Sequence, residues 1–487
     1  MAEKKSNAKD KKKKDQPKLK TLQEKLTVKY PNLFDLTDAA TLKQAYAYAD
    51  QYKQFISAAK TEREFTALAS QRLEASGFTP LQAAGARLKP GDRVYQPLRG
   101  KALMAAVVGQ DLCAGGFRVL GAHIDSPRFD SKPTPIYEDS DLVLMKTHYY
   151  GGVKKYQWTT IPLALHGIAV TQDGSAVTVC IGESESDPVF TFSDLLIHLS
   201  REQLQKSAAQ VVTGEECNLI LGSRPLADKG DGRFKLQVLA LLFDRYGLTE
   251  EDLVSAELEI VPAGAARDVG IDRSLIGAYG QDDRVCAYPS LTALLDLPQA
   301  VPAHTCVTLL SDKEEVGSDG NTGAAARPYE TFLMDLLARS RGSYDELAFR
   351  HLLEDSCMLS SDVTNGLDPS FASVSDPRNS AYLGRGMAVC KVTGSGGKAG
   401  ASEASTEYMG AVCRMLKAHH LPWQSGELGK VDAGGGGTIC KYFANLGMQV
   451  LDCGVPVLSM HSPFEISHKL DVYYTYLAYR CFLEKFA

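Results

Sequence analysis

The chain has 487 residues, of which 44% are hydrophobic and 23% are charged, values typical of a folded enzyme of two or three domains. Its 11 cysteines are odd in number and scattered, with no CxxC pair. This pattern excludes a disulfide framework and a structural zinc site, and it indicates a reducing compartment. No apolar run approaches the roughly 18 residues that span a bilayer, and the first residues lack the apolar core of a signal peptide. We therefore expect a cytoplasmic protein with no membrane partner.

The chain begins with a basic tail. Residues 1–20 contain nine lysines against Glu3, Asp10 and Asp15, a local charge of +6. The net charge of the whole chain is −6, so the remaining residues together carry −12. Because this segment has almost no apolar residue to bury, we predict that residues 1–21 are disordered. A basic tail can also contact nucleic acid or an acidic surface. No aromatic residues are interleaved here, and we expect no nucleic-acid partner.

Elements of an α/β fold follow the tail. Apolar residues recur at helical spacing over residues 22–77, and again later in the chain over residues 331–351, which predicts helix in both stretches. Short apolar runs then predict strands over residues 102–108 and 117–122. The second strand leads into a His-x-Asp motif formed by His123 and Asp125. Residues i and i+2 of an extended segment point the same way, so Asp125 can orient a metal-bound His123; a histidine in an ordinary turn is the alternative.

The middle of the chain differs in character. Residues 134–261 contain short strand-like runs, such as 176–180 and 236–243, between charged and glycine-containing loops. None of the candidate metal ligands lies here, and prolines at 133, 135 and 262 flank the segment. We therefore predict an inserted β-rich domain between two parts, residues 22–133 and 262–487, of one α/β domain.

A pair of glutamates stands at the centre of the second part. The apolar run 306–310 predicts a buried strand, and Glu314 and Glu315 follow where this strand ends. Open α/β sheets place their ligands at the carboxyl ends of strands. In metal-dependent hydrolysis one carboxylate binds a divalent cation and another takes a proton from water. A solvated acidic turn is the alternative for such a pair.

Further candidate ligands occupy similar positions. Asp282 and Asp283 open an apolar helical stretch, where a carboxylate can also serve as a plain cap. Asp362 and His461 end short apolar runs. With His123 and one of the two glutamates they form a ligand set for two divalent ions bridged by one carboxylate, which needs about five ligands and one base. Mixed histidine and carboxylate ligands suit zinc, with manganese or cobalt as alternatives.

Two glycine-rich segments, residues 394–400 and 432–438, lack the residue order of a phosphate loop. Glycine lets backbone approach a ligand closely. We therefore expect these segments, and Gly435 and Gly436 in particular, to contact the substrate.

Six motifs together resemble the aspartyl aminopeptidase and vacuolar aminopeptidase I family of dinuclear zinc metallopeptidases, and most closely its bacterial branch. They are GAHIDSP, QDDRV, SDKEEVGS, SSDVTN, DAGGGGTI and VLSMHSPFE. The resemblance covers residue 22 to the C-terminus. It implies an α/β fold in which a split peptidase domain, with a central mixed sheet flanked by helices, carries an inserted β-rich domain that dimerises and roofs the cleft. It also implies peptide substrates and a homododecamer built from dimers.

The resemblance also implies roles for individual residues. His123 and Asp362 would bind one metal ion, Glu315 and His461 would bind the other, and Asp282 would bridge them. Asp282 is favoured over its neighbour Asp283 because the bridging aspartate of the family directly follows a Gly-x pair.

The same resemblance makes Glu314 the general base and Asp125 the partner of the first histidine. A metal-bridging hydroxide would attack the peptide bond that follows the N-terminal residue.

Two departures from the family bear on substrate choice. Tyr156 stands where eukaryotic members carry a histidine thought to reach a neighbouring active site, and residues 363–369 replace a histidine-containing motif. The remaining candidate cations are Lys391 and Lys398, whereas Asp368 would repel an acidic side chain if it lined the pocket. We predict a broad or neutral-to-hydrophobic preference, with an acid-specific aminopeptidase as the alternative.

Two other functions fit the same residues. Related metal sites serve deacylases and carboxypeptidases, and activity on an N-blocked peptide would distinguish these from an aminopeptidase. A catalytically inactive assembly protein is the third possibility, and the complete ligand set argues against it.

Overall fold

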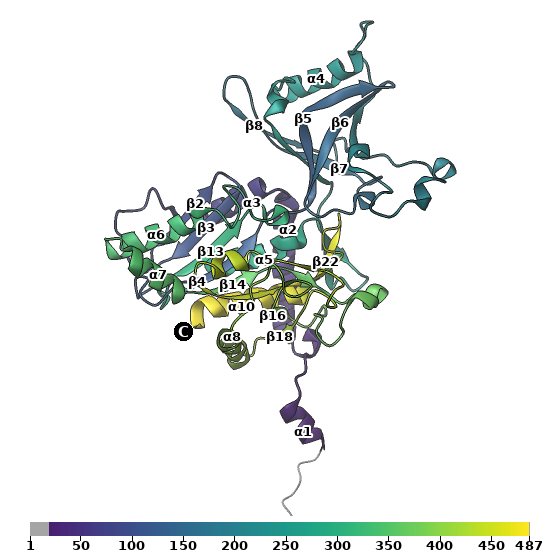
Figure 1. Cartoon of the computed structure of the whole chain (residues 1–487). Coiled ribbons are helices and arrows are strands. Elements are labelled where there is room, and N and C mark those ends of the chain that lie inside the picture. Colours follow the sequence, from purple (N-terminus) through teal and green to yellow (C-terminus); the bar gives the residue numbers. More distant parts are fainter. Residues whose placement is uncertain (1–18, 487) are drawn as a thin grey trace, which may run out of the picture.

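The structure is a computed structural model that describes residues 19–486 (Figure 1). Most of the predicted disordered tail, residues 1–18, lies outside the described residues. The prediction is wrong for residues 19–21, which belong to helix α1 (Leu19–Leu26), because apolar residues at positions 19, 22 and 26 recur at helical spacing. None of the described helices is long and apolar enough to cross a membrane.

A nine-stranded mixed sheet forms the larger part of the molecule and confirms the predicted α/β fold. Its three central strands β13, β4 and β14 run parallel, whereas β3 pairs with β13 in the antiparallel direction. The predicted strands 102–108, 117–122 and 306–310 correspond to β3, β4 and β13. The strand order is β1 (Thr79–Pro80), β2 (Arg93–Leu98), β3 (Ala102–Val107), β13 (Cys306–Ser311), β4 (Arg118–His123), β14 (Cys357–Ser361), β20 (Gln449–Gly454), β16 (Met387–Cys390) and β18 (Trp423–Ser425).

Helices cover both faces of this sheet, and alternate residues of its strands enter two separate cores. In β3, Leu103 and Ala105 pack into one core, while Ala102 and Met104 pack into the other, as the period of two requires. The first core contains α2 (Ala39–Ala58), α3 (Glu62–Ala75), α5 (Gln281–Leu295), α8 (Thr406–Ala418) and α10 (Lys469–Lys485). The second contains α6 (Arg327–Arg341), α7 (Glu346–Glu354) and α9 (Cys440–Ala444).

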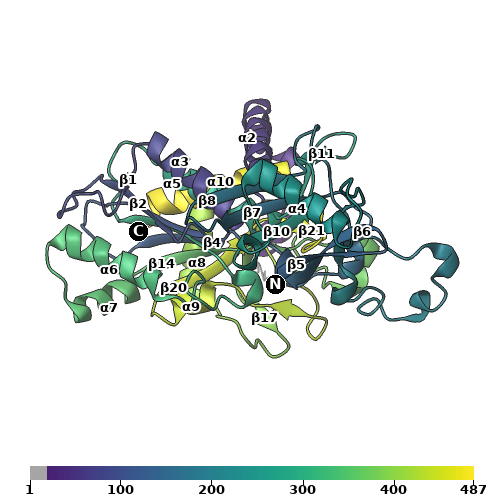
Figure 2. The ribbon, with the colours of Figure 1, turned by 90° about the horizontal axis from the view of Figure 1, so that it is seen from above.

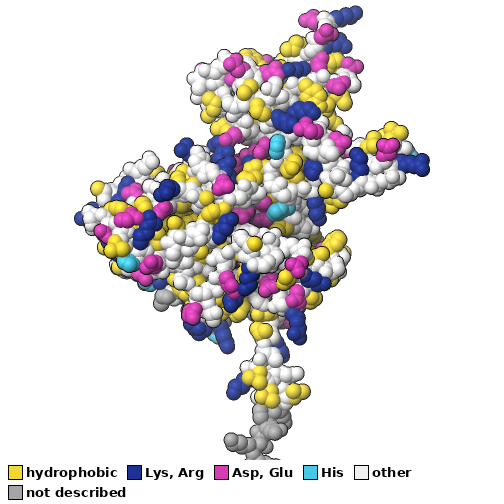
Figure 3. Space-filling view, viewed as in Figure 1, with side chains coloured by type: hydrophobic (Ala, Val, Ile, Leu, Met, Phe, Trp, Pro, Cys, Tyr) yellow, Lys and Arg dark blue, Asp and Glu magenta, His cyan; other side chains and the backbone are white. Residues whose placement is uncertain are grey.

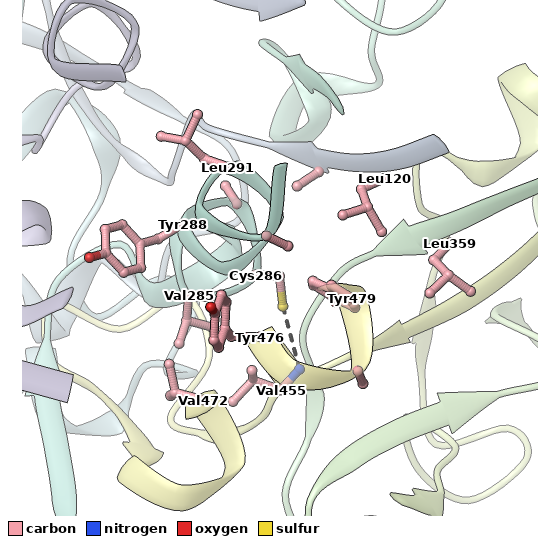
Figure 4. Packing of buried hydrophobic residues seen from close by; sticks show 14 of the residues in the cluster. Leu120, Val285, Cys286, Tyr288, Leu291, Leu359, Val455, Val472, Tyr476 and Tyr479 are labelled. Atoms are coloured by element: carbon pink, nitrogen blue, oxygen red, sulfur yellow. Dashed lines mark hydrogen bonds between the residues drawn. The ribbon is translucent and has the colours of Figure 1, made fainter. Parts of the chain in front are cut away.

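The first core is centred on α5 and α10 (Figure 4). Val285 and Cys286 of α5 lie beside Tyr476 of α10, whereas Leu291 points to the opposite side of α5. Each of these side chains is largely or wholly removed from water. This packing anchors the start of α5, from which one of the candidate ligands projects.

Two long helical stretches predicted from the sequence are interrupted. The stretch over residues 22–77 divides into several helices, and Thr61 begins α3 with a capping box to Glu64. The stretch over residues 331–351 divides into α6 and α7, because Gly342 ends α6 in the left-handed region at φ 77°. Apolar periodicity continues across both breaks, so it does not reveal them.

A six-stranded antiparallel sheet stands apart from the first (Figure 1). Helix α4 (Arg233–Tyr246) packs along it, and this corrects the strand-like interpretation of residues 236–243. Figure 2 shows the molecule from above, with α6 and α7 toward one end and β6 toward the other. The strand order is β8 (Ala176–Ile181), β7 (Leu163–Val170), β10 (Glu257–Pro262), β5 (Arg128–Asp139), β6 (Leu142–Tyr150) and β9 (Asn218–Gly222).

The start of this sheet differs from the predicted domain boundary. The predicted division between residues 133 and 134 falls inside β5, which begins at Arg128. Pro133 and Pro135 coincide with a shift of register between Ser131 and Ile136. Proline cannot donate a backbone hydrogen bond and therefore occurs at bulges within sheets. The prolines thus mark an irregularity within a strand, and the division into domains stays a prediction.

Two smaller sheets complete the architecture. The glycine-rich segments pair with each other through β17 (Gly394–Ser395) and β19 (Gly435–Gly436). The other is a five-stranded sheet, and its β12–α5 and β21–β22 connections reach the candidate site from the side of α5. Its strand order is β11 (Arg267–Val269), β12 (Leu275–Ala278), β22 (Glu465–His468), β21 (Pro456–Leu458) and β15 (Thr364–Asn365).

Candidate metal centre

Four of the candidate residues reach the site from the parallel strands of the nine-stranded sheet. His123 is the last residue of β4, Asp362 follows β14, and Glu314 and Glu315 open the short helix η7 (Glu314–Val316) after β13. Because β13, β4 and β14 are adjacent and parallel, their carboxyl ends meet at one edge. Strand polarity therefore brings together residues that are up to 239 positions apart.

The other two candidates arrive from the five-stranded sheet. Asp282 lies at the start of α5, directly after β12, and His461 lies in the loop between β21 and β22. A buried carboxylate, Glu465, holds these two segments together. It accepts hydrogen bonds from the backbone N–H groups of His461 (2.7 Å), Gln281 (2.6 Å) and Asp282 (3.1 Å). Sequence analysis missed Glu465, although it ends the motif that contains His461.

Asp282 stands between the two histidines. Its Oδ1 lies 3.2 Å from Nε2 of His123, and its Oδ2 lies 3.1 Å from Nε2 of His461. On the first side, Asp362 Oδ1 is 4.0 Å from the His123 nitrogen, and on the second, Glu315 Oε2 is 3.4 Å from the His461 nitrogen. Two of the three groups of donor atoms among the described residues thus share the Asp282 carboxylate, and the third consists of His123, Glu314 and Glu315. Within each group the atoms lie within 4.8 Å of one another.

Asp283, the alternative bridging residue, has a different environment. Its Oδ2 accepts a hydrogen bond from the backbone N–H of His123 at 3.4 Å, and its side chain is fully buried. Burial raises the pKa of this carboxyl well above its usual value. Asp283 belongs to neither of the two groups that share Asp282, and the geometry therefore favours Asp282 as the bridge.

Asp125 supports the site from behind the ligands. Its Oδ1 lies 3.3 Å from Nδ1 of His123, and its two oxygens accept hydrogen bonds from the backbone N–H groups of Glu314 (3.1 Å) and Glu315 (3.2 Å). The hydroxyl of Tyr150 donates a further bond at 2.8 Å. Burial alone would raise the pKa of Asp125, but the bond to the histidine and its charge lower it. Asp125 therefore remains ionised and orients both the imidazole and the glutamate pair.

The site concentrates negative charge without enough protein cations to balance it. Burial raises the pKa of Glu314 to about 7, and burial together with the charge of Asp282 raises that of Glu315 well above its usual value. Burial lowers the pKa of His461, but its bond to Asp282 and the charge of Glu315 raise it to about 10.

One atom of this set is also left without a partner. Glu315 Oε1 is buried and has no hydrogen-bond partner among the described residues, an arrangement that is costly unless a cation is bound. The mixed histidine and carboxylate donors suit zinc. The residues therefore fit a pair of divalent cations.

A cavity of about 790 Å³ opens in front of these side chains. Figure 3 shows acidic and histidine side chains in the hollow between the two parts of the molecule. Gly435 and Gly436, predicted to contact the substrate, line the cavity, and so does Lys398. Tyr156 and Lys391 are absent from its described lining, and the side chain of Tyr156 is 40% exposed. Lys430 and Lys441 also line it and were missed, because isolated lysines carry no distinctive signal.

One histidine and three carboxylates lie at the carboxyl ends of the mixed sheet, and a second histidine and a fourth carboxylate join them from the five-stranded sheet. This arrangement defines a metal-dependent hydrolase. Comparison with known proteins then gives the family. The family model described as aminopeptidase I zinc metalloprotease (M18) matches residues 55–483. The chain belongs to this family of aminopeptidases.

Individual relatives agree with the family match. A probable M18 family aminopeptidase 1 of Clostridium acetobutylicum is 50% identical over 463 residues, which cover 94% of this chain and 99% of that protein. The crystal structure of an M18 family aminopeptidase from Thermotoga maritima has a TM-score of 0.90 at 44% identity and covers 94% of this chain and 100% of that one. The S. cerevisiae mApe1 dodecamer has a TM-score of 0.73 at 18% identity, with 90% and 97% covered, a likeness that concerns the fold alone.

Proposed function

We propose that this aminopeptidase uses two divalent metal ions, zinc in the first instance, with manganese or cobalt as alternatives. His123 and Asp362 would hold one ion, Glu315 and His461 the other, and Asp282 would bridge them. The observation that carries the proposal is the position of Asp282, whose two oxygens each face a different histidine. When bound, the ions would polarise the scissile carbonyl, increase the acidity of a water molecule and bind the free α-amine of the substrate.

Glu314 is the general base in this proposal. Its carboxylate lies 4.0 Å from Nε2 of His123 and lines the cavity, while the backbone N–H of the residue is held by Asp125. A pKa of about 7, raised chiefly by burial, suits a group that must accept and release a proton near neutral pH. Glu314 would take a proton from the attacking water and deliver it to the departing amine.

We further propose a broad or neutral-to-hydrophobic preference for the N-terminal residue. Two of the three lysines that line the cavity have polar partners: Lys398 Nζ lies 2.9 Å from Glu403, and Lys430 donates to the carbonyl of Ser373 at 2.7 Å. The third, Lys441, lies over the ring of Tyr442 at 4.8 Å. Asp368 caps the short helix η8 (Pro369–Val374) through Ser370 and is absent from the described lining of the cavity. The repulsion by Asp368 considered from the sequence therefore no longer supports this preference, and the partnered lysines support it instead.

Self-association into a homododecamer built from dimers is the remaining part of the proposal. Several large apolar side chains are exposed on the part of the chain that contains the six-stranded sheet, including Leu196, Ile197 and Leu241. Such surfaces commonly mark contacts between proteins. The dodecamer formed by mApe1, which shares the fold, agrees with this proposal. Equilibrium sedimentation should give a particle of about twelve subunits, and a stable monomer would contradict it.

Activity assays test the proposal as a whole. The metal-free protein is incubated with zinc, manganese or cobalt and then offered a panel of aminoacyl chromogens together with an N-acetylated peptide. We expect metal-dependent cleavage of the free amines, strongest for neutral residues, and no cleavage of the blocked peptide. Cleavage of the blocked peptide would favour a deacylase or carboxypeptidase, and inactivity of a metal-loaded, assembled protein would favour the assembly role.

A further inference from the structure

The end of strand β6 reaches the metal centre from the six-stranded sheet. Tyr150 is the last residue of β6 and pairs in register with Arg128 of β5. The Arg128 guanidinium carbon lies 4.1 Å from the centre of the Tyr150 ring. Arg128 is itself buried and held by Asp130 at 2.8 Å and Glu259 at 3.2 Å. The position of the tyrosine ring is therefore fixed by the sheet to which it belongs.

The hydroxyl of Tyr150 points at the carboxylate behind the first histidine. It donates to Asp125 Oδ2 at 2.8 Å, and Asp125 is fully buried. The carboxylate also accepts hydrogen bonds from two backbone N–H groups of the glutamate pair. It lies 3.3 Å from Nδ1 of His123, which lies 3.1 Å from the backbone carbonyl of Asp125 as well. Because Asp125 accepts the proton of Nδ1, Nε2 of His123 is left free to bind a cation.

The two glycines that follow Tyr150 contact the second half of the site. The carbonyl of Gly152 lies 3.1 Å from Nδ1 of His461. A carbonyl can only accept, so Nδ1 carries the proton and Nε2 faces Asp282. A Cβ atom at Gly151 would come within 3.2 Å of the Glu315 Cβ, and one at Gly152 within 3.2 Å of the His461 ring. Side chains larger than hydrogen would crowd both ligands.

We propose that Tyr150–Gly152 is a positioning segment through which the six-stranded sheet orients both metal-binding histidines. The segment acts on His123 through Asp125 and on His461 directly through a carbonyl. This inference rests on the proposed metal-binding function. It predicts that the six-stranded sheet, which supplies no member of the ligand groups among the described residues, nevertheless controls the affinity for metal.

The test compares Tyr150→Phe with Tyr149→Phe in the full-length protein. The first substitution removes the hydroxyl and keeps the ring on Arg128, whereas Tyr149 is the adjacent, half-exposed tyrosine of the same strand. Zinc affinity is measured by competition with a chromogenic chelator. Substitutions behind a metal ligand typically cost roughly 10–100-fold in affinity, and we expect a loss in this range for Tyr150→Phe and none for Tyr149→Phe.

Melting in excess chelator reports the stability of the metal-free fold separately. If Tyr150→Phe melted lower but bound zinc as tightly as the wild type, Tyr150 would have only a structural role and the inference would be wrong. If the wild type itself bound no zinc, the proposed function would fail instead.

Gly152→Ala tests the other arm of the segment. Gly152 has an ordinary negative φ, so alanine is compatible with the backbone, and its methyl group would displace His461. We expect weaker zinc binding here as well, and the effect should add to that of Tyr150→Phe because the two act on different histidines. If Gly152→Ala bound zinc as tightly as the wild type, the proposed orientation of His461 by Gly152 would be wrong.

Discussion

The two large sheets of the molecule differ in what they bring to the metal centre. Strands β3, β13 and β4 of the nine-stranded sheet are buried on both faces, and candidate ligands lie at the carboxyl ends of β13 and β4. The six-stranded sheet has partly exposed strands such as β8 and β9, and it offers a hydroxyl and a carbonyl that orient those ligands. Rigid, doubly covered strands suit groups that must hold a precise geometry. The six-stranded sheet needs only to place the end of β6 next to these ligands.

The contact between the two regions is itself ionic and buried. Lys60, just before α3, lies within 2.5 Å of Glu183, which follows β8. His166 of β7 lies between Glu183 (3.0 Å) and Glu64 of α3 (2.7 Å). These contacts link the six-stranded sheet to α3, and the charge of His166 contributes to their strength.

The largest effect should come from the side of the nine-stranded sheet, at the proposed base Glu314. Glu314→Gln keeps the shape of the side chain but cannot take a proton, and general-base catalysis is worth about 10²–10⁴-fold in rate. We expect kcat to fall by this amount while metal content stays as in the wild type. Glu354→Gln, at the exposed end of α7, is the control and should be fully active. Activity of Glu314→Gln within a few-fold of the wild type would assign the role of base elsewhere.

A neighbouring residue should show the opposite pattern. Glu315→Gln removes a proposed ligand, so we expect its zinc affinity to fall by at least the roughly 10–100-fold seen for groups behind a ligand. Elemental analysis after dialysis measures the remaining metal. The matched comparison is Glu314→Gln, which differs by one position and should retain both ions. Equal metal content in the two variants would remove the distinction between base and ligand.

The junction between the two regions should respond to pH. Burial lowers the pKa of His166, but its hydrogen bonds to Glu183 and Glu64 raise it above 6.5. Because the pKa of His166 is higher in the folded than in the unfolded protein, its protonation stabilises the fold. This stabilisation is fully present below about pH 6.5 and is lost as the pH rises through the pKa of the folded state.

His166→Gln should therefore destabilise the protein most near pH 6, by about 1.5–3 kcal/mol for a bond to a charged group, and less near pH 9. Melting curves across this range measure the difference from the wild type. His351→Gln, on the exposed face of α7, is the control. A loss of stability that does not change with pH would indicate that His166 is neutral in the folded protein.

The smallest effect is expected at the cavity wall. Lys398 is exposed and paired with Glu403, and an exposed pair contributes little because water and salt screen it. Lys398→Ala should thus change the ratio of kcat/KM for Leu- and Asp-chromogens by no more than about fivefold. Lys391→Ala, which alters a lysine near the same glutamate but outside the described lining of the cavity, is the matched control. An acidic preference that collapses only in Lys398→Ala would identify this lysine as the specificity determinant.

Much of the fold follows from local patterns in the chain. The strands β3, β4 and β13 are continuous apolar runs because both of their faces are covered, and such runs are visible without any knowledge of their neighbours. Breaks inside long helical patterns are harder to predict. Gly342 and the cap at Thr61 interrupt apolar periodicity that continues on both sides, and residues 236–243 are apolar enough to suggest a strand although they form a helix.

The candidate ligands could be selected from the sequence because each is a metal-binding residue type beside the end of a predicted element. The structure brings all five of them together with Glu314. The family resemblance implies their division into two groups, but residue type and spacing do not, because the division depends on which oxygen of Asp282 faces which histidine.

The residues that orient the ligands lie beyond the reach of sequence reasoning. Glu465 and Tyr150 belong to β22 and β6, and their partners lie up to 184 positions away along the chain. Their types, a buried glutamate and a strand tyrosine, are compatible with many roles. Residue type and strand periodicity are properties of short segments, so the sequence by itself determines the chemistry available at the strand ends. The approach of β6 to those ends results from packing between distant segments, and only the tertiary structure decides it.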